Sequence, residues 1–263
     1  MSAPVIPPAV ALIFCALAGL CVGSFLNVVI ARVPEGRSIA YPGSACPRCG
    51  TTIRWYDNVP VLSFILLHAR CRSCRNPIAW RYPLVETASA VLFVLAYLRF
   101  GLSLQLAAVL LLLSALIAIT GIDLDHQIIP DVLSLPGIAF GLLASLGPHG
   151  IGWMNSLLGL VVGGGVFVVI IAGSTLVLGQ PGMGVGDVKL GAMLGAFLGW
   201  QLGLLGILLS VLIGGPLAAG LLATGRKGRK DPLPFGPFLA LGGVVSLFWG
   251  DAILAWYFGH FLS

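Results

Sequence analysis

Long apolar runs, separated by shorter polar segments, dominate the sequence. Eight can be distinguished, and most approach the roughly 17 to 25 residues that a helix needs to cross a bilayer. They cover residues 7 to 31, 84 to 100, 104 to 122, 132 to 148, 155 to 178, 188 to 202, 204 to 223 and 236 to 259. The pattern predicts an all-α polytopic membrane protein with about eight transmembrane helices. The weakest boundary lies between Gly199 and Gly203, where two short runs could instead form one long helix.

One polar segment, residues 32–83, is much longer than the others. We therefore expect three parts: a first transmembrane helix in residues 1–31, a polar loop domain in residues 32–83 and a membrane core in residues 84–263. No basic segment precedes the first apolar run, whereas Arg32 and Arg37 follow it. This argues against a cleavable signal peptide and favours an N-terminus outside the cytoplasm.

The composition agrees with this interpretation. Hydrophobic residues make up 58% of the chain and charged residues only 9%, whereas about 25% charged residues is typical of soluble domains. A soluble two-domain enzyme, a disordered scaffold and a small disulfide-rich secreted protein are excluded. Eight of the 14 basic residues lie in the polar segment and four lie in residues 226–230, so the positive-inside rule places both regions on the cytoplasmic side. The second cluster is typical of contact with lipid headgroups and is too short to favour nucleic-acid binding.

Two Cys-x-x-Cys pairs, Cys46 with Cys49 and Cys71 with Cys74, stand 21 residues apart in the polar loop. Two such pairs can supply a tetrahedral four-thiolate site for Zn²⁺. Disulfides and unligated or redox-active cysteines are the alternatives, although a cytoplasmic loop is kept reduced. Because four thiolates fill the coordination shell, we expect a structural rather than a catalytic ion that holds the loop domain together.

Acidic residues stand where the apolar runs break. Asp123 and Asp125 follow the third run, and Asp187 precedes the sixth after a glycine-rich segment. Two carboxyl groups brought close together can share a proton and activate water for amide hydrolysis. A solvated loop acid is the alternative for Asp125, and a helix-start residue is the alternative for Asp131. Lys189 is expected to act on Asp187 or to bind a backbone carbonyl.

Taken together, these motifs resemble those of the type IV prepilin peptidases, a family of membrane aspartic proteases that often also methylate their product. The resemblance covers most of the chain, and the motifs occur in the family's order. They are Gly23 to Pro34, both cysteine pairs, Trp55 to Ser63, Arg81 to Glu86, Asp123 to Asp131 and Gly184 to Asp187. The segment Leu67-His-Ala-Arg70 departs from the family, where glycine and lysine are more common before the second cysteine pair.

The resemblance implies cleavage of the basic leader of prepilins and pseudopilins at the cytoplasmic face of the bacterial inner membrane. It places the catalytic aspartates at Asp123 and Asp187, with Asp125 as an open alternative to Asp123. The long cysteine-bearing loop further implies transfer of a methyl group from S-adenosylmethionine to the new N-terminal amine, but no motif identifies the donor site. A peptidase without methyltransferase activity remains an alternative.

Two functions of other classes are also compatible with acids at a membrane. An ion-coupled transporter predicts acids near the bilayer midplane, often in repeated halves. Here the acids gather toward one face, and the sequence has no visible repeat. An assembly scaffold that binds pilus or secretion components would leave the paired acids unexplained.

Overall fold

Helices form almost all the regular structure of the described chain. The computed structural model describes residues 7–148, 150–180, 182–224 and 233–261. Within these ranges the structure contains eight α-helices, one short 3₁₀ helix and two isolated β-bridges. The chain divides into two compact units, Met1–Leu106 and Ala107–Ser263. The basic cluster at residues 226–230 lies outside the described residues.

In the first unit, helix α1 (Pro8–Arg32) packs against helix α3 (Arg81–Phe100). Gly19 and Gly23 lie four residues apart on α1, and a Cβ atom at either position would lie 2.6 Å from a Cα atom of α3. Small residues with this spacing allow two helix backbones to approach closely in a membrane. The polar loop between α1 and α3 contains only η1 (Trp55–Asp57) and α2 (Leu62–Leu66) as helical segments.

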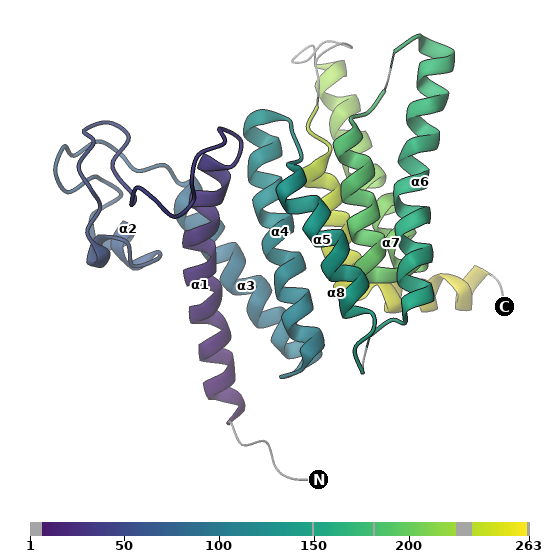
Figure 1. The fold of residues 1–263 in the computed structure, drawn as a ribbon, viewed down its shortest axis with the longest axis horizontal. Coiled ribbons are helices and arrows are strands. Elements are labelled where there is room, and N and C mark those ends of the chain that lie inside the picture. The colour runs from purple at the N-terminus through teal and green to yellow at the C-terminus, as the bar shows by residue number, and fades with distance from the viewer. Residues whose placement is uncertain (1–6, 149, 181, 225–232, 262–263) are drawn as a thin grey trace. The chain divides into compact units, whose positions relative to one another are not determined.

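The second unit is a helical bundle (Figure 1). Its helices are α4 (Leu104–His126), which begins just before the unit boundary, α5 (Asp131–Ala144), α6 (Trp153–Leu178), α7 (Val185–Ala223) and α8 (Gly236–Phe261). Glycines also bring α6 and α7 together, since a Cβ atom on Gly195 would collide with the carbonyl oxygen of Gly159. The Ser156 hydroxyl then donates a hydrogen bond to the Ala196 carbonyl oxygen at 2.6 Å.

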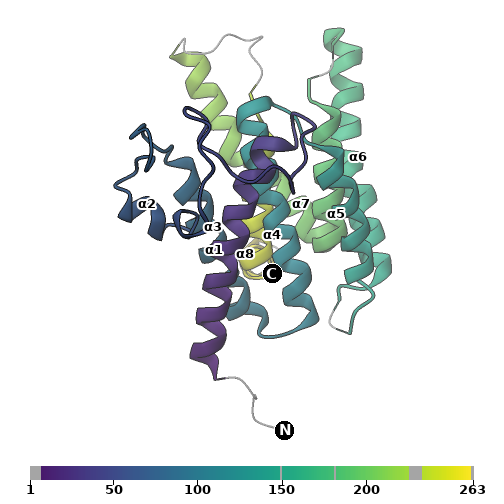
Figure 2. The ribbon, with the colours of Figure 1, turned by 60° about the vertical axis from the view of Figure 1, so that its left-hand side comes forward.

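The break expected between Gly199 and Gly203 is present within α7. Gly199 has non-helical backbone angles, φ 79° and ψ 175°, which glycine adopts readily. A Cβ atom on Gly203 would lie 3.2 Å from the Cα atom of Gly195, although eight residues of straight helix span about 12 Å. The two segments of α7 therefore fold back on each other, and the reversal is visible in Figures 1 and 2.

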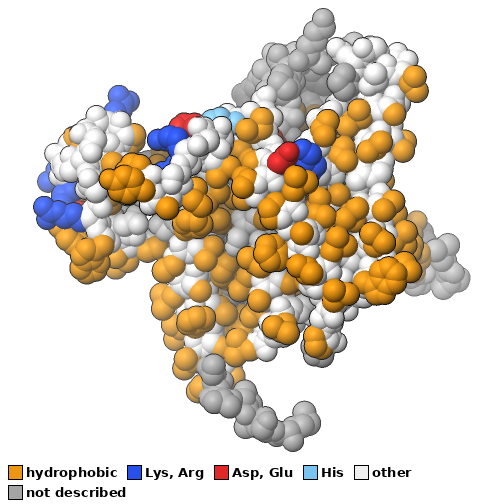
Figure 3. Space-filling view, viewed as in Figure 1, with side chains coloured by type: hydrophobic (Ala, Val, Ile, Leu, Met, Phe, Trp, Pro, Cys, Tyr) orange, Lys and Arg blue, Asp and Glu red, His pale blue; other side chains and the backbone are white. Residues whose placement is uncertain are grey.

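The expectation of an all-α polytopic membrane protein is confirmed. Six of the described helices, α1, α3, α4, α6, α7 and α8, are long and apolar enough to cross a membrane, and α5 is a shorter apolar helix of 14 residues. The expected count of eight spans is not confirmed, because α5 is short and α7 is one 39-residue element with an internal reversal. Hydrophobic side chains cover the visible faces of the helices, whereas charged side chains gather over the polar loop and toward one end of the second unit (Figure 3).

The polar ends of several helices meet at one end of the second unit. The C-terminal ends of α4 and α6 and the N-terminal ends of α5, α7 and α8 all lie at this end (Figures 1 and 2). Asp123 belongs to the last turn of α4, and Asp187 belongs to the first turn of α7. The fold therefore places both predicted acids at the same end of the bundle.

Candidate active site and metal centre

Asp123 is held by the start of α8. The residue is only 5% exposed, and its Oδ2 accepts a hydrogen bond from the backbone N–H of Gly236 at 2.9 Å. Because Gly236 is the first residue of α8, the positive end of that helix dipole is directed toward the carboxylate. A Cβ atom at position 236 would lie 2.7 Å from Oδ2, so this hydrogen bond depends on glycine.

Asp187 is held by the turn that begins α7. It is 9% exposed, and its Oδ2 accepts a hydrogen bond from the Gly184 N–H at 3.2 Å. In return, the Asp187 N–H donates to the Gly184 carbonyl oxygen at 3.1 Å. Gly184 precedes the first residue of α7 and Asp187 is the third, which is the spacing of a capping box. One carboxyl oxygen of Asp187 therefore stabilises the helix start.

Contacts between the α4–α5 connection and the first turn of α7 bring the two acids together. A Cβ atom at Gly186 would lie 2.9 Å from the Cβ of Ile129, so the chains approach closely there. Lys189 forms an ion pair with Asp131 at 2.5 Å. The Asp123 and Asp187 carboxyl groups are near enough to interact electrostatically. Within the described residues, Oδ1 of neither acid takes part in a hydrogen bond, which leaves one oxygen on each carboxyl group for another partner.

The neighbouring charged residues differ from this pair. Asp125 is exposed, whereas Asp123 is buried. Asp131 is the first residue of α5, as one interpretation expected, and its carboxylate binds Lys189. Lys189 was expected to act on Asp187 or to bind a backbone carbonyl, and the structure shows its ammonium group paired with Asp131.

The four predicted cysteine ligands converge in the first unit. The sulfur atoms of Cys46, Cys49, Cys71 and Cys74 all lie within 4.8 Å of one another. Cys46 Sγ and Cys74 Sγ are 3.8 Å apart, close to the roughly 3.8 Å edge of a tetrahedron with 2.3 Å zinc–sulfur bonds. All four thiols are free. Their number, chemistry and spacing fit one tetrahedral metal ion.

Each cysteine pair is built by the same backbone hairpin. In both, the N–H of the first cysteine donates to the carbonyl five residues later, and the N–H four residues later donates back to the cysteine carbonyl. The residue after the second cysteine has a positive φ in both hairpins, 69° at Gly50 and 58° at Arg75. The bonds are Cys46 to Thr51 at 3.0 Å, Gly50 to Cys46 at 2.9 Å, Cys71 to Asn76 at 2.8 Å and Arg75 to Cys71 at 3.0 Å. We refer to these hairpins, residues 45–52 and 70–77, as the two knuckles.

Local hydrogen bonds favour the thiolate form that binds metals. A hydrogen bond with the Thr51 side chain lowers the pKa of Cys49 to about 6. Backbone hydrogen bonds from Cys74 and Ser73 lower the pKa of Cys71. Because the thiolate is the metal ligand, these hydrogen bonds favour metal binding by Cys49 and Cys71, whereas the pKa of Cys74 is raised.

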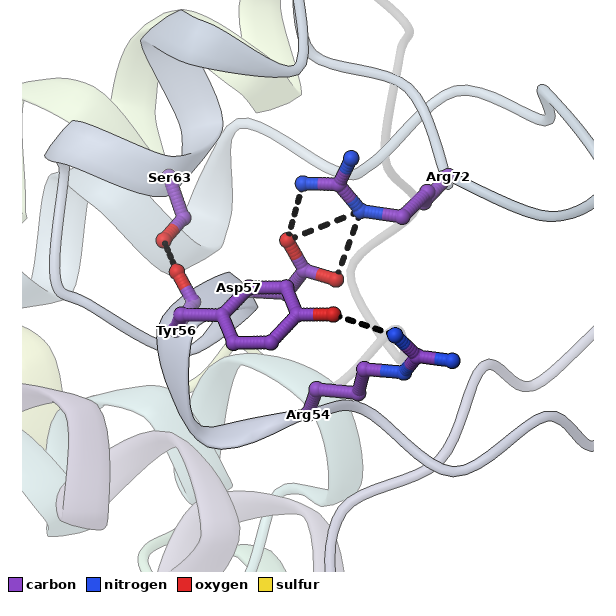
Figure 4. Close-up of polar contacts among 5 residues, drawn as sticks. All are labelled: Arg54, Tyr56, Asp57, Ser63 and Arg72. Carbon is purple, nitrogen blue, oxygen red and sulfur yellow. Dashed lines mark hydrogen bonds and ion pairs between the residues drawn. The ribbon is translucent and has the colours of Figure 1, made fainter.

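Arg72 links the second knuckle to η1 (Figure 4). Its guanidinium donates to both carboxylate oxygens of Asp57, with Nη2 2.6 Å from Oδ1 and Nε 2.9 Å from Oδ2, and this pairing lowers the pKa of Asp57. Arg72 also lies over the Tyr56 ring, 5.6 Å from its centroid, and Ser63 donates a hydrogen bond to the Tyr56 carbonyl at 3.0 Å. The Arg72 charge is therefore paired with Asp57.

The fold and sites define a multi-pass helical membrane protein with two buried, backbone-held carboxyl groups and a separate four-thiolate loop. The chain belongs to the type IV leader peptidase family, whose model matches residues 110–219. A model described as the bacterial peptidase A24 N-terminal domain matches residues 17–100. The first match contains both acids, and the second contains all four cysteines.

Curated relatives cover nearly the whole chain. A prepilin leader peptidase/N-methyltransferase of Pseudomonas aeruginosa is 42% identical over 264 residues, covering 92% of this chain and 91% of the relative. A protein of the same name from Aeromonas hydrophila is 39% identical, with 94% and 93% covered. One from Myxococcus xanthus is 45% identical, with 83% and 65% covered. No solved structure matches the chain.

Sequence reasoning missed Gly236 as part of the acid site. The residue stands between Phe235 and Pro237 at the start of the last apolar run. A proline suits the first turn of a helix, so this segment marks a helix start whose free N–H groups could bind a carboxylate. Only the fold shows that this carboxylate belongs to Asp123.

Proposed function

We propose that this protein is a membrane aspartic endopeptidase that removes the basic leader of type IV prepilins and pseudopilins, and then methylates the new N-terminal amine. The observation that carries the peptidase assignment is the pairing of Asp123 and Asp187. Both acids are buried, both are held through one oxygen by a backbone N–H, and both lie at the same end of the helical bundle. The names of the relatives support both activities.

The proposed cleavage uses the two acids in different protonation states. One ionised carboxylate accepts a proton from water as the water oxygen attacks the scissile carbonyl carbon. The other carboxyl group, protonated, donates a hydrogen bond and then its proton toward the substrate. The N–H groups of Gly236 and Gly184 fix the orientation of the carboxyl groups, and the second oxygen of each carboxyl group remains available for these proton transfers.

We place this chemistry at the cytoplasmic face of the bacterial inner membrane. The two basic regions favour a cytoplasmic location for the polar loop and for residues 226–230 under the positive-inside rule. The end of the second unit that carries the acids also leads into residues 226–230, so the same rule places the acids on that side. The lipid bilayer is the second expected partner, and no nucleic-acid partner is proposed.

The three parts of the chain receive different roles in this proposal. Residues 1–31 anchor the polar loop, residues 32–83 form a zinc-binding domain, and residues 84–263 contain the peptidase acids. Zn²⁺ held by the four cysteine thiolates would supply a structural cross-link, since four protein ligands leave no open position for chemistry. S-adenosylmethionine is the proposed methyl donor.

A peptidase without methyl transfer and an ion-coupled transporter are the alternatives. The first conflicts with the double name of the relatives. The second predicts acids near the bilayer midplane, whereas Asp123 and Asp187 lie at helix ends. Both alternatives are therefore less well supported than a bifunctional peptidase.

Incubation of the purified protein with a prepilin, followed by intact-mass measurement, tests the proposal. Loss of the leader mass reports cleavage, and a further gain of one methyl group in the presence of S-adenosylmethionine reports methyl transfer. Asp123→Asn and Asp187→Asn are the matched controls. Leader removal at the wild-type rate by both variants would contradict the assignment of these acids.

A further inference from the structure

Glu86 in the first unit is a buried acid without a cationic partner. The residue is 7% exposed and lies on α3 one turn after Tyr82. Its carboxylate accepts hydrogen bonds from the Val61 backbone N–H, at 2.8 Å, and from the Ser24 side chain. The ion pairs formed in the described part of the chain do not include it. Buried carboxylates are normally paired with a cation, so this environment is incomplete.

Asn27, on helix α1, which packs against α3, has a buried acceptor that lacks a hydrogen-bond donor. It is 3% exposed, and its Oδ1 is buried without a hydrogen-bond donor among the described residues. The amide nitrogen donates to the carbonyl oxygens of Gly23, at 3.3 Å, and Tyr82, at 3.2 Å. Since both of these partners are acceptors, the NH₂ group must face them and the oxygen must face away.

An apolar cavity is connected to the Glu86 environment through Val61. It has a volume of about 430 Å³ and is lined by Val61, Phe64, Trp80, Pro83 and Thr87, among others. Val61 joins the two features, because its N–H binds Glu86 and its side chain lines the cavity. Polar atoms contribute almost nothing to the walls. The cavity suits an apolar group, and the Glu86 carboxylate behind Val61 and the Asn27 oxygen are acceptors that suit a cationic N–H donor.

We propose that Glu86 and Asn27 bind the N-terminal ammonium group of the cleaved substrate, while the first apolar residues of that substrate occupy the neighbouring cavity. A free N-terminus joined to an apolar helix offers both features together. The sulfonium of the methyl donor carries no N–H, and its adenosine and carboxylate groups would find few polar partners on the cavity walls. This inference rests on the proposed methyltransferase function and assigns the binding site of the methyl acceptor.

Peptide binding to the full-length protein tests the proposal directly. The probe is a peptide from the mature N-terminus of a pilin, labelled at its C-terminus and followed by fluorescence anisotropy. Acetylation of its N-terminal amine should weaken binding at least about tenfold, the effect of losing one charge-assisted hydrogen bond of ordinary strength. Glu86→Gln should weaken the free-amine peptide by a similar factor and leave the acetylated peptide unchanged.

Two further variants separate binding from folding. Ser89→Ala removes a fully buried hydroxyl on α3, one turn from Glu86. In the described structure the Ser89 hydroxyl donates a hydrogen bond to the Val85 carbonyl of the same helix. The Ser89→Ala variant should therefore bind the free-amine peptide normally. Glu86→Asp keeps the charge and should recover part of the affinity. Ser89→Ala should retain the zinc content and prepilin cleavage of the wild type, and both Glu86 variants should retain its zinc content, which shows that the first unit is folded.

Three results would overturn the proposal. The first is equal binding of free-amine and acetylated peptides by the wild type, and the second is wild-type peptide binding by Glu86→Gln. The third is a rise in KM for S-adenosylmethionine in Glu86→Gln with unchanged peptide affinity, which would assign the site to the ammonium group of the donor. Methyl transfer by the wild type to the free-amine peptide, measured in parallel, tests the methyltransferase function separately.

Discussion

At the scale of single residues, backbone groups hold the two acids of the second unit. Gly236 and Gly184 each use one N–H to bind one carboxyl oxygen, at 2.9 Å and 3.2 Å. A backbone donor has no side-chain freedom to lose, so it fixes the carboxyl group at little entropic cost. Substitutions at the acids and at the glycines should therefore act on the same step.

Asparagine at either acid should remove cleavage, because it retains the shape of the side chain but cannot exchange a proton. We expect Asp123→Asn and Asp187→Asn each to reduce the cleavage rate at least about 1,000-fold, and the double variant to be little worse, since groups that act as a unit give non-additive losses. Prepilin cleavage measured by mass spectrometry checks this. Asp125→Asn is the exposed control and should keep substantial activity. Full activity in Asp123→Asn with loss in Asp125→Asn would move the first acid by two residues.

Alanine at Gly236 should damage the acid site through a single methyl group. The added Cβ would lie 2.7 Å from Asp123 Oδ2, so the carboxyl group or the start of α8 must move. We expect cleavage to fall at least about tenfold, because small misplacements of catalytic groups can cost far more than this. Gly165→Ala on α6 is the matched control, since its Cβ would meet nothing within 4 Å. Equal cleavage rates in the two variants would show that the Gly236 contact is unimportant.

The Asp57–Arg72 pair should stabilise the polar loop in a pH-dependent way. The folded pKa of Asp57 lies below its ordinary value of about 3.9, mainly because Arg72 donates hydrogen bonds to the carboxylate. A depressed folded pKa gives stability that is fully present above the unfolded pKa and is lost as the pH falls through the folded pKa. Hydrogen exchange of residues 54–63, corrected for intrinsic rates, should show wild-type protection exceeding that of Asp57→Asn at pH 7. That difference should begin to shrink below about pH 4 and disappear only once the pH falls below the folded pKa of Asp57. A difference independent of pH would argue against the ion pair as its cause.

Sequence patterns identify site residues best where the chemistry requires several residues at a fixed spacing. The cysteine pairs were predictable because two residues suffice to form each half of a thiolate site. Asp123 and Asp187 could be identified as helix-end acids, and the fold then placed them together. The partners of Lys189 and Glu86 could not be predicted, since the ion pair with Asp131 spans 58 residues and the Val61 hydrogen bond spans 25. Such partners depend on tertiary packing, which no local pattern reports.

At the scale of elements, the polar loop has few helical residues and little buried apolar surface of its own. Among the four cysteines of the polar loop, only Cys46 is buried, and η1 has no buried residue. A segment of this size usually needs a metal or disulfides to remain folded. The two knuckles are therefore the main cross-link of the loop.

The protein should contain about one Zn²⁺ per chain, bound by Cys46, Cys49, Cys71 and Cys74. Elemental analysis of gently purified protein checks the stoichiometry. Replacement of any one of these cysteines by serine should loosen the loop and increase its proteolysis, while the membrane helices still insert. Cys21→Ser, at an exposed position in α1, is the control and should retain the metal. Active protein without zinc would contradict this assignment.

The boundaries of the elements followed the hydropathy pattern only in part. The pattern correctly placed a break near Gly199, because short apolar runs and glycines coincide there. It extended the fourth run to residue 148, whereas α5 ends at Ala144, since apolar composition alone does not mark a helix end. The close approach of α6 to α7 at Gly159 and Gly195 could be suspected from glycine content, but the partner helices could not be assigned.

At the scale of the whole molecule, the proposed topology is testable with reporter fusions. Fusions at Arg54 and Arg229 should report a cytoplasmic location, and fusions at Arg99 and Gly150 a periplasmic one, because basic residues concentrate in the first two regions. The result at Arg229 depends on the reversal at Gly199. A periplasmic signal there would mean that α7 crosses the membrane once as a single long helix.

The repeated hairpins also bear on how the polar loop assembles. Each knuckle closes on its own backbone hydrogen bonds between residues no more than five apart, so its two sulfurs can come together before any ion arrives. Metal capture then has to join only two preformed half-sites across 21 residues, a loop closure whose entropic cost grows slowly with length. The first knuckle could hold an incoming ion through two thiolates while the second is still being synthesised. Maturation of the loop can therefore begin during translation, as soon as the first hairpin has left the ribosome.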